Sequence, residues 1–422
     1  MKTKTAQKSY DEVMALPRTK HKKPEKTNIF FRTLLKLVSI PDLMATHFSV
    51  RKIGMERLGK KEPALFLMNH SSFIDLEIAV SVLYPRPLNI IATSDSFVGM
   101  NWLMRKIGCF PTQKFVFDVT SFFGIRHCLK KLGSSVLMYP EASYSFDGSA
   151  TPLPENLGTL VKKLGVPVVM LRTYGAFTRD PLYNGLQRRK TTVSADLKYL
   201  LSPDEIEKMS DGELQAVLEG EFTFDHFRWQ KENNVKISEP FRADMLNRVL
   251  YKCPHCLTEG KTEGKGIHLT CHACGKKYEL SEYGELIATD GDTAFSYVTD
   301  WYRWEREEVR REIEDGRYSL DVPVKIAMLV DTKRVYFVGE GRLTHTTDGF
   351  RLTGCDGKID YRQSAKSSYS LYSDYNWYEL GDVICIGDTK ALYYCFPQST
   401  GDVVAKTRLA TEEIFKYIKR KK

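Results

Sequence analysis

The sequence has no long uninterrupted apolar run, and this absence excludes one class of protein. None of its stretches approaches the ~18–20 consecutive apolar residues of a membrane-spanning helix, so we predict no transmembrane segment. The opening residues, MKTKTAQKSYDEV, lack the apolar core of a secretory signal peptide. Nine cysteines without such a signal favour a reducing compartment over a framework of disulfides. We therefore expect a cytoplasmic protein.

The chain also lacks internal repeats and long low-complexity tracts, and at 422 residues it is long enough for two or three domains. Positive charge is in excess, with a formal net charge of +9. Part of this excess lies in two runs, RTKHKKPEK (Arg18 to Lys26) and KYIKRKK (Lys416 to Lys422). Either run alone is compatible with a solvated tail.

The segment NIFFRTLLKLVS follows the first basic run and predicts a strongly apolar helix. Arg32, Lys36 and Ser39 share one helical stripe, and apolar side chains occupy the rest: Phe30, Phe31, Leu34, Leu35, Leu37 and Val38. Such a helix suits the interface plane of an anionic membrane, with headgroups near the lysines. A helix packed on the core of the protein itself would give the same pattern. The membrane interpretation predicts peripheral binding at the cytoplasmic face.

Short apolar runs alternate with helical patterns from about residue 62 to residue 200. The runs ALFLM, LNIIA, SVLMY and VPVVML are continuous rather than alternating, as in parallel strands buried on both faces. The pattern predicts an α/β domain whose ligands bind beyond the carboxyl ends of the strands. Two polar motifs, NHSSFID and PEAS, each follow such a strand and are expected on the same rim of the sheet.

The remaining chain divides by composition into further units. We predict a basic segment and amphipathic helix over 1–50, the α/β domain over 51–250, a cysteine-bearing module over 251–285, and a linker helix with a β-rich domain over 286–422. Residues 203–250 are expected to be mostly helical, starting from a cap at Ser202. In the last unit, Asp348-Gly349, Asp356-Gly357 and Gly387-Asp388 predict hairpin turns, and TEEIFKYIKR predicts a closing helix.

NHSSFID (Asn69 to Asp75) allows two interpretations. Ser72 and Asp75 fit the S-x-x-[DE] capping box that opens a helix, which would leave His70 an incidental loop residue. Alternatively, Asp75 folds back across a strand-to-helix turn and hydrogen-bonds one imidazole nitrogen of His70. The other nitrogen is then free to accept a proton from a hydroxyl. No convincing serine or cysteine nucleophile lies beside the pair, so direct attack by a substrate alcohol is the simpler hypothesis.

Four ordered blocks resemble the glycerolipid acyltransferases of the lysophosphatidate acyltransferase type. NHSSFID matches the N-H-x-x-x-x-D block of that family, and GCFPTQK (Gly108 to Lys114) lies where the family has G-x-F-x-x-x-R. YPEAS (Tyr139 to Ser143) matches F-P-E-G-T, and VPVVML matches the apolar fourth block. The resemblance covers roughly residues 50–200. It implies an α/β acyltransferase domain of mixed or parallel sheet flanked by helices.

The resemblance implies transfer of an acyl group from a thioester, either acyl-CoA or acyl-carrier protein, to the hydroxyl of a lysophospholipid, most simply 1-acylglycerol 3-phosphate. His70 would be the general base and Asp75 would orient it. Lys114, Glu141 and Ser143 would form the end of the site that binds the acceptor phosphate, with Glu141 orienting the lysine or holding acceptor hydroxyls. A surface ion pair between Lys114 and Glu141 is the alternative. Another lyso-lipid acceptor and thioester hydrolysis also remain open.

Two departures from the family blocks concern the acceptor end. Lys114 stands where the family has arginine, so the charge is kept while the bidentate fork is lost. Ala142 and Ser143 replace glycine and threonine. Ser143 keeps a hydroxyl, whereas alanine does not easily adopt a positive φ if the loop requires one. These changes leave the identity of the acceptor open.

Two C-x-x-C knuckles, Cys253 with Cys256 and Cys271 with Cys274, supply four thiolates at zinc-binding spacing. The sequence predicts a structural Zn²⁺ in a module that resembles a zinc ribbon; four free or disulfide-paired thiols are the alternative. His255 and His272 lie inside the knuckles and are interpreted as bystanders. The insert has no clustered basic face with interleaved aromatic residues, which argues against nucleic acid as a partner.

The β-rich tail with its closing helix resembles a pleckstrin-homology-like domain in strand count and order, and such a fold does not fix a function. A hypothesis from another class is therefore a non-catalytic lipid-binding or scaffold protein on an acyltransferase fold. The intact pair of His70 and Asp75 argues against it.

Overall fold

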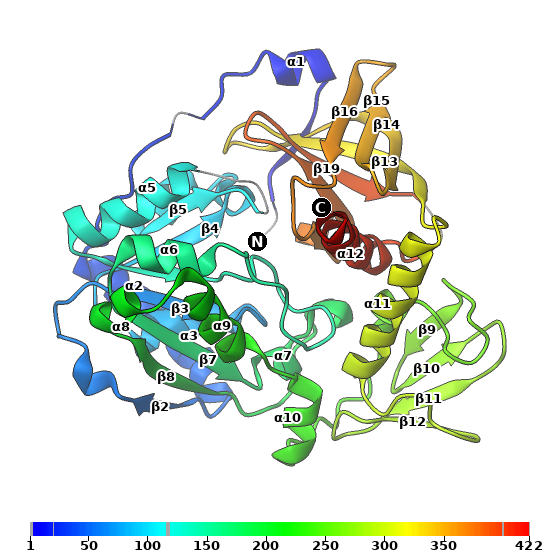
Figure 1. Ribbon diagram of the computed structural model, residues 1–422, viewed down its shortest axis with the longest axis horizontal. Helices are drawn as coiled ribbons and strands as arrows, with labels where there is room; N and C mark the ends of the chain where they lie inside the picture. Colours follow the sequence, from blue (N-terminus) through cyan, green and yellow to red (C-terminus); the bar gives the residue numbers. More distant parts are fainter. Residues whose placement is uncertain (1–2, 20, 115–118, 399–400, 422) are drawn as a thin grey trace.

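The computed structural model describes residues 3–19, 21–114, 119–398 and 401–421. Lys20 and Lys422, which belong to the two basic runs, lie outside these ranges. Figure 1 shows an α/β layer built on one sheet, and beside it a β-rich domain, a small four-stranded sheet and the helices that connect them. Among the described residues, no helix is long and apolar enough to span a membrane.

A seven-stranded sheet forms the centre of the first layer, in the order β2-β8-β7-β3-β6-β4-β5. All neighbouring strands are parallel except β7 and β8. The four predicted apolar runs are confirmed as strands β3, β6, β4 and β7. The strands are β2 (Ser49–Ile53), β3 (Leu65–Met68), β4 (Leu88–Thr93), β5 (Cys109–Thr112), β6 (Ser135–Met138), β7 (Val168–Tyr174) and β8 (Ser194–Leu201).

Both faces of this sheet are buried, which explains why the strand sequences are continuously apolar. In β3, Phe66 and Met68 pack into one core cluster, whereas Leu65 and Leu67 pack into a second cluster on the other face. The covering helices are α2 (Ile29–Ala45), α3 (Ile74–Val82), α4 (Asn101–Lys106), α5 (Val119–His127), α6 (Leu157–Leu164), α7 (Ala176–Arg179), α8 (Pro203–Lys208) and α9 (Asp211–Phe222). Helix α10 (His226–Glu232) lies beyond the sheet and packs through Phe227 into the core cluster that includes the cysteine module. The Ser202 cap is confirmed, because its hydroxyl accepts a hydrogen bond from the Glu205 amide.

Helix α2 forms where it was expected, but the face that it exposes is not the basic one. Ser39 is 2% exposed, the Arg32 guanidinium donates to the Pro85 and Asn28 carbonyl oxygens, and Lys36 lies 4.4 Å from the Tyr84 ring centroid. The long stems of Arg and Lys cover apolar surface while their cationic ends reach nearby acceptors. The stripe is therefore partly packed against the protein, and its contact with headgroups stays a prediction. The exposed face is apolar: Ile29, Phe30, Leu34, Leu37, Val38 and Met44.

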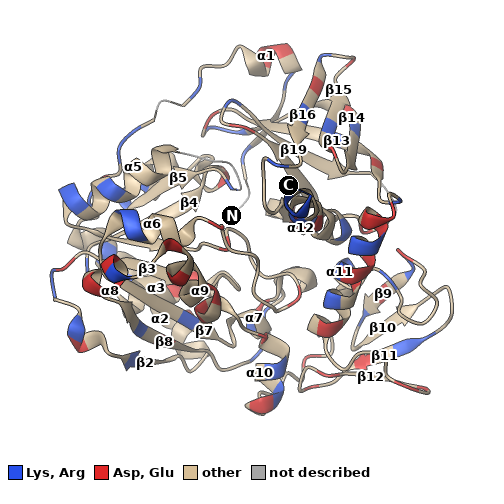
Figure 2. Ribbon diagram, viewed as in Figure 1, with Lys and Arg blue, Asp and Glu red and all other residues tan. Residues whose placement is uncertain are grey.

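The cysteine-bearing module is an antiparallel sheet of β9 (Thr262–Lys265), β10 (His268–Cys271), β11 (Lys277–Leu280) and β12 (Leu286–Ala288). Helix α11 (Val298–Glu314) follows it and packs on it through Trp301. The Trp301 ring lies 5.1 Å from the Tyr278 ring, and its indole N–H donates to the Lys252 carbonyl oxygen at 2.9 Å. Figure 2 shows acidic and basic residues alternating along α11. The module and α11 therefore share a packed interface.

The last domain is an antiparallel sheet in the order β16-β15-β14-β13-β19-β18-β17, followed by the predicted closing helix α12 (Val404–Arg420). Its strands are β13 (Leu320–Leu329), β14 (Val335–Thr346), β15 (Gly349–Gly354), β16 (Ile359–Ser364), β17 (Tyr372–Asp374), β18 (Val383–Gly387) and β19 (Leu392–Pro397). The three predicted turns lie between β14 and β15, between β15 and β16, and between β18 and β19, so all three are confirmed. Helix α12 packs along α11.

Two features that the sequence did not predict connect the α/β layer with the C-terminal domain. Residues Thr5–Gln7 form β1, which pairs in parallel with β14 of the last sheet, and α1 (Tyr10–Met14) follows it. In addition, one apolar core cluster joins the cysteine module, α11, the last sheet and Phe146 of the α/β layer. The first segment of the chain is therefore part of the C-terminal domain in space.

Candidate active site

The three polar blocks converge at one rim of the seven-stranded sheet. NHSSFID follows β3, YPEAS follows β6, and Gln113-Lys114 follows β5. Strands β3 and β6 are neighbours, and β4 joins β6 to β5. Because all four strands are parallel, their carboxyl ends lie at the same edge, as the sequence predicted.

His70 and Asp75 are paired at this rim. The Nδ1 atom of His70 lies 3.1 Å from Oδ2 of Asp75, whose side chain is fully buried. The same carboxylate oxygen accepts hydrogen bonds from the Ser71 amide at 2.6 Å and the Ser72 amide at 3.0 Å. These contacts fix the carboxylate, and the carboxylate in turn holds Nδ1 as the protonated nitrogen of the neutral ring.

Only half of the capping box expected from Ser72 and Asp75 is present: the Ser72 amide donates to Asp75 Oδ2 at 3.0 Å, whereas the Ser72 hydroxyl accepts from the Ile74 amide at 3.4 Å rather than from the Asp75 amide. The helix begins at Ile74, and Phe73 at the cap position makes no side-chain hydrogen bond to it. Asp75 accepts from backbone amides of the turn before the helix and from His70. The aspartate therefore stabilises the strand-to-helix turn and orients the imidazole with one oxygen.

The imidazole of His70 lies in an aromatic, half-buried setting. Its ring centroid is 4.2 Å from that of Tyr139 and 4.1 Å from that of Tyr144. Burial lowers the pKa of His70, Asp75 opposes this shift, and the charge of Lys114 lowers the pKa further. Within the described ranges, no residue hydrogen-bonds to Nε2. At neutral pH this nitrogen is an unprotonated base that is free to accept a proton.

Glu141 is buried behind the histidine and does not contact Lys114. One carboxylate oxygen accepts from the His70 amide at 2.8 Å, and the other accepts from the amide and hydroxyl of Thr151 at 2.8 and 3.0 Å. Burial raises the pKa of Glu141 to about 7, against the effect of these hydrogen bonds. Glu141 thus ties the loop after β6 to the backbone of the catalytic candidate, and a surface ion pair with the lysine is ruled out.

Lys114 faces the C-terminal domain. Its ammonium lies 4.1 Å from the ring centroid of Tyr372 in β17. Burial lowers its pKa, whereas the carboxylates of Asp95 and Asp374 raise it. Burial also raises the pKa of Asp374 to about 7. The lysine is therefore a partly desolvated cation at the boundary between the two domains.

Ser143 meets a residue that the sequence did not single out. Its buried hydroxyl accepts a hydrogen bond at 2.9 Å from Nη2 of Arg408, which lies on α12. The guanidinium carbon of Arg408 also lies 4.2 Å from the Phe146 ring centroid. The neighbouring Ala142 adopts a φ of 56°, so this loop does require the left-handed conformation that alanine adopts only at a cost.

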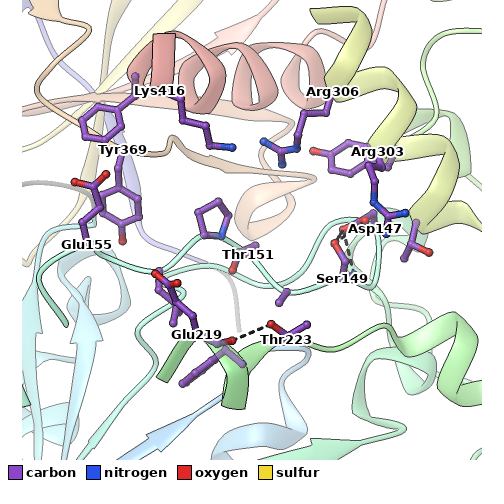
Figure 3. A pocket seen from close by; sticks show the side chains of 17 residues that line it. Asp147, Ser149, Thr151, Glu155, Glu219, Thr223, Arg303, Arg306, Tyr369 and Lys416 are labelled. Atoms are coloured by element: carbon purple, nitrogen blue, oxygen red, sulfur yellow. Dashed lines mark hydrogen bonds between the residues drawn. The ribbon is translucent and has the colours of Figure 1, made fainter. Parts of the chain in front are cut away.

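A cavity of about 430 Å³ opens beside the loop after Glu141. Figure 3 shows Arg306 of α11 and Lys416 of α12 pointing into it, opposite Thr151 and Glu219. Thr151 connects this cavity to the histidine through the carboxylate of Glu141. The cavity therefore lies one hydrogen-bonded carboxylate away from the candidate catalytic pair, and three parts of the chain line it.

The four cysteines of the two knuckles come together outside this site. Their sulfur atoms all lie within 4.8 Å of one another, with Cys253 3.8 Å from Cys274 and Cys256 3.7 Å from Cys271. Four sulfurs at about 2.3 Å from a tetrahedral zinc ion would be about 3.8 Å apart, so the donor set fits that metal. All nine cysteines are free of disulfides. His272 contacts Glu263 instead of joining the cluster.

Sequence reasoning missed three contributors to the site. Tyr144 follows the YPEAS block directly, and its place in the motif could have suggested it. Thr151 lies ten residues beyond Glu141, and its contact depends on how the loop folds back. Arg408 lies 265 residues beyond Ser143. Nothing in its local sequence indicates that it reaches the rim of another domain.

Comparisons with known proteins match part of the chain. Residues 49–172 match the family model described as Acyltransferase, and this segment holds His70, Asp75, Lys114, Glu141 and Ser143. A chloroplastic 1-acyl-sn-glycerol-3-phosphate acyltransferase of Brassica napus is 30% identical over 128 residues, which are 29% of this chain and 36% of the relative. A chloroplastic 1-acyl-sn-glycerol-3-phosphate acyltransferase of Arabidopsis thaliana is 29% identical over 128 residues, which are 29% of this chain and 35% of the relative.

The chain thus spans about a third of the length of these curated relatives. Among solved structures, the 1-acyl-sn-glycerophosphate acyltransferase PlsC of Thermotoga maritima is similar, with 18% identity and a TM-score of 0.37. That match covers 45% of this chain and 76% of the bacterial one. The cysteine module and the last β domain lie beyond residues 49–172, the segment that the family model matches.

Proposed function

We propose that this protein is an acyltransferase that moves a fatty acyl group from a thioester to the free hydroxyl of a lysophospholipid, with 1-acylglycerol 3-phosphate as the acceptor. One observation carries the proposal. His70 and Asp75 are paired at the rim of the sheet, within the segment that matches the acyltransferase model. The acyl donor is a thioester of coenzyme A or of an acyl-carrier protein.

The geometry supports direct attack by the acceptor. Nε2 of His70 accepts the hydroxyl proton while the acceptor oxygen bonds to the thioester carbonyl carbon. Asp75 holds Nδ1–H and stabilises the imidazolium that forms. The tetrahedral intermediate then breaks its carbon–sulfur bond, and the imidazolium returns the proton to the leaving thiolate. The products are the diacylated phospholipid and the free thiol, and the histidine is again neutral.

The direct test is acyl transfer by the purified full chain. Oleoyl-CoA and oleoyl-acyl-carrier protein are offered with 1-oleoylglycerol 3-phosphate and with a panel of other lyso-lipids, and products are measured by mass spectrometry. We expect phosphatidate to form fastest. Release of free fatty acid without any acylated acceptor would instead identify a thioester hydrolase, and no turnover of either donor would favour a non-catalytic lipid-binding protein.

We further propose that Cys253, Cys256, Cys271 and Cys274 hold a structural Zn²⁺ in a zinc ribbon. The support is the spacing of the sulfur atoms and the absence of an acid or base among the four ligands. Bound there, zinc would cross-link the two knuckles and contribute folding energy to the module. The strand order and the single closing helix support a pleckstrin-homology-like assignment for the last domain.

We also propose that the protein docks peripherally on an anionic membrane, at the cytoplasmic face, because its acceptor is a lipid. The support is an apolar surface rather than a basic stripe. Phe30 and Val38 are each 65% exposed on α2, and Trp102, 68% exposed on α4, contacts Phe31 at 6.2 Å between ring centroids. Arg105 adjoins Trp102 in α4 and supplies positive charge, whereas Lys106 pairs with Glu25 at 3.1 Å. Large exposed apolar surfaces of this kind are typical of interaction sites.

Replacing Phe30 and Val38 together with aspartate should remove most binding to anionic vesicles at high salt. Each buried Å² of apolar surface contributes roughly 25 cal/mol, and that contribution resists salt, whereas attraction of basic residues to the membrane weakens as salt rises. Vesicle flotation at low and at high salt measures the apolar and the electrostatic contributions separately. The matched control replaces Leu257 and Ile287, which are 57% and 51% exposed on the cysteine module, with aspartate. Flotation of the Phe30/Val38 variant like the wild type would exclude α2 as the docking surface.

A further inference from the structure

Arg408 is a buried cation whose charge is only partly matched. Its side chain is 3% exposed, and its Nη1 atom has no hydrogen-bond partner among the described residues. Nη2 donates to Ser143, and Nε lies 3.4 Å from a carboxylate oxygen of Glu412. A guanidinium has five N–H donors, and leaving one of its nitrogens unpaired in the interior is costly. Such a group calls for an anionic partner.

Glu412 does not neutralise Arg408 by itself, because other groups share this carboxylate. Arg306 donates to its second oxygen at 2.6 Å, and Ser370 donates to the first at 2.7 Å. The neighbouring Glu413 accepts from Arg306, Arg310 and Lys416. Arg310 also pairs with Glu307 at 2.6 Å. Four cations of this network (Arg306, Arg310, Arg408 and Lys416) therefore share three carboxylates, and Arg408 is the one that contacts Ser143 of the candidate site.

The loop that Arg408 contacts also hydrogen-bonds to the backbone of His70 at both of its ends. At one end of the loop, Glu141 accepts from the His70 amide, and at the other end the Ser145 amide donates to the His70 carbonyl oxygen at 3.0 Å. Ser143 lies between these two contacts. Arg408 therefore contacts the loop that frames His70 directly. The charge of Arg408 also lowers the pKa of Lys114, as expected of two cations brought near each other.

We propose that Arg408 is a binding residue for the phosphate of the acceptor, so that α12 of the C-terminal domain completes the acyltransferase site. Ser143 of the loop after β6 and Arg408 of α12, which are in contact, then bind the phosphate from two domains. In 1-acylglycerol 3-phosphate the free hydroxyl and the phosphate stand on adjacent carbons, so a phosphate at Ser143 keeps the hydroxyl near His70. This inference rests on the proposed function and adds the group that recognises the acceptor.

The presence of lysine at position 114, where the acyltransferase family has arginine, agrees with a phosphate-binding role for Arg408. A lysine is a point charge, whereas phosphate recognition gains from the planar, bidentate fork of arginine. The chain has lost that fork at the end of β5, and Arg408 brings one to the same rim from α12. The domain interface is consequently part of the site rather than only a structural contact.

The test compares Arg408→Gln and Arg408→Lys with the wild-type full chain. Arg420→Gln is the matched control, because Arg420 lies on the same helix, and its exposed side chain contacts Glu314 far from Ser143. KM and kcat are measured with 1-oleoylglycerol 3-phosphate, with 1-oleoylglycerol, which lacks the phosphate, and with varied oleoyl-CoA. Thermal stabilisation by sn-glycerol 3-phosphate is measured in parallel, since it does not depend on turnover.

Arg408→Gln is expected to raise KM for the phosphate-bearing acceptor about 10–100-fold, the range for loss of a charge-assisted hydrogen bond, and Arg408→Lys by less. KM for oleoyl-CoA and transfer to 1-oleoylglycerol should not change, and the stabilisation by glycerol 3-phosphate should disappear. The Arg420→Gln control should match the wild type in every measurement.

An equal loss with both acceptors would give Arg408 a structural role and overturn the proposal, as would a raised KM for oleoyl-CoA, which would place the donor phosphates there. If the wild type transfers to neither acceptor, the proposed function fails, and stabilisation by glycerol 3-phosphate still decides whether Arg408 binds phosphate. If Arg408→Gln does not fold, Arg408→Lys, which keeps the charge and most of the packing, provides the comparison. Equal phosphate binding by Arg408→Lys and Arg420→Gln, or none by the wild type, would contradict the assignment.

Discussion

Replacing His70 with alanine is expected to lower kcat by about 10²–10⁴-fold, the usual contribution of a general base. Nε2 is the nitrogen that accepts the proton of the acceptor, and within the described ranges no residue occupies it. The fold should survive, because the imidazole is half-buried and its loss leaves the backbone contacts of His70 with Glu141 and Ser145 intact. Steady-state rates measure the loss of kcat, and circular dichroism shows whether the fold is intact.

Asp75→Asn belongs to the same experiment and should lose activity in two ways. An amide nitrogen in place of Oδ2 cannot accept the proton on Nδ1, and an amide oxygen there stabilises the imidazolium less than a carboxylate does. The Ser71 and Ser72 amides also lose part of their acceptor. His127→Ala, a change to a histidine of α5, serves as the matched control. Full turnover by Asp75→Asn, with only a lower melting temperature, would reduce the aspartate to a turn-stabilising residue.

Removal of zinc is expected to unfold the cysteine module and to destabilise the C-terminal half of the chain. A structural zinc ion contributes on the order of 10 kcal/mol to the folding of a small module. The module shares a core cluster with α11 and the last sheet, and the Lys252 amide donates to Glu305 of α11. The loss should therefore spread from the knuckles to the helix that contacts α12. Metal analysis should give one zinc per chain.

The variant for this prediction is Cys256→Ser, and Cys355→Ser, outside the cluster, is its control. Calorimetry should show the first melting transition of Cys256→Ser lowered by roughly 20–40 °C, since a loss on the order of 10 kcal/mol lowers the melting temperature by roughly 2–4 °C for each kcal/mol in a domain of about 150–250 residues. The control should bind zinc like the wild type. Less than one zinc per chain after purification without added metal, with all four thiols open to alkylation, would exclude the site.

Local patterns were enough to predict the elements of the fold. Continuous apolar runs became the buried strands of the first sheet, Asp-Gly and Gly-Asp pairs became turns, and Ser202 became a helix cap, because each depends on neighbouring residues. The orientation of α2 was not predictable in this way. An amphipathic pattern shows that a helix has two faces, and only tertiary packing decides that Arg32 and Lys36 cover the protein while Phe30 faces outward.

The same distinction between local pattern and tertiary packing applies to the residues of the candidate site. His70 and Asp75 are five residues apart, and one strand-to-helix turn brings them together, so their spacing was informative. Glu141 was found as part of a motif, but its partners, the amides of His70 and Thr151, depend on the path of a loop. Arg408 reaches the site only because α12 packs against that loop. Contacts between domains of this kind leave no local signal in a single sequence.

The pairing of β1 with β14 has a consequence for how the molecule comes apart. Three residue pairs, Thr5 with Val335 through Gln7 with Phe337, close a loop that contains the whole first sheet and the cysteine module. Helix α1 adds to this attachment, because Val13 is buried in the core cluster of the last sheet and Asp11 pairs with Lys358. The entropy of closing a loop rises only slowly with its length, but so small an attachment holds the loop closed only while the enclosed chain is ordered. Thr5–Gln7 should therefore detach as soon as the two domains separate. Proteolysis near Lys8 would then report domain separation before either core unfolds.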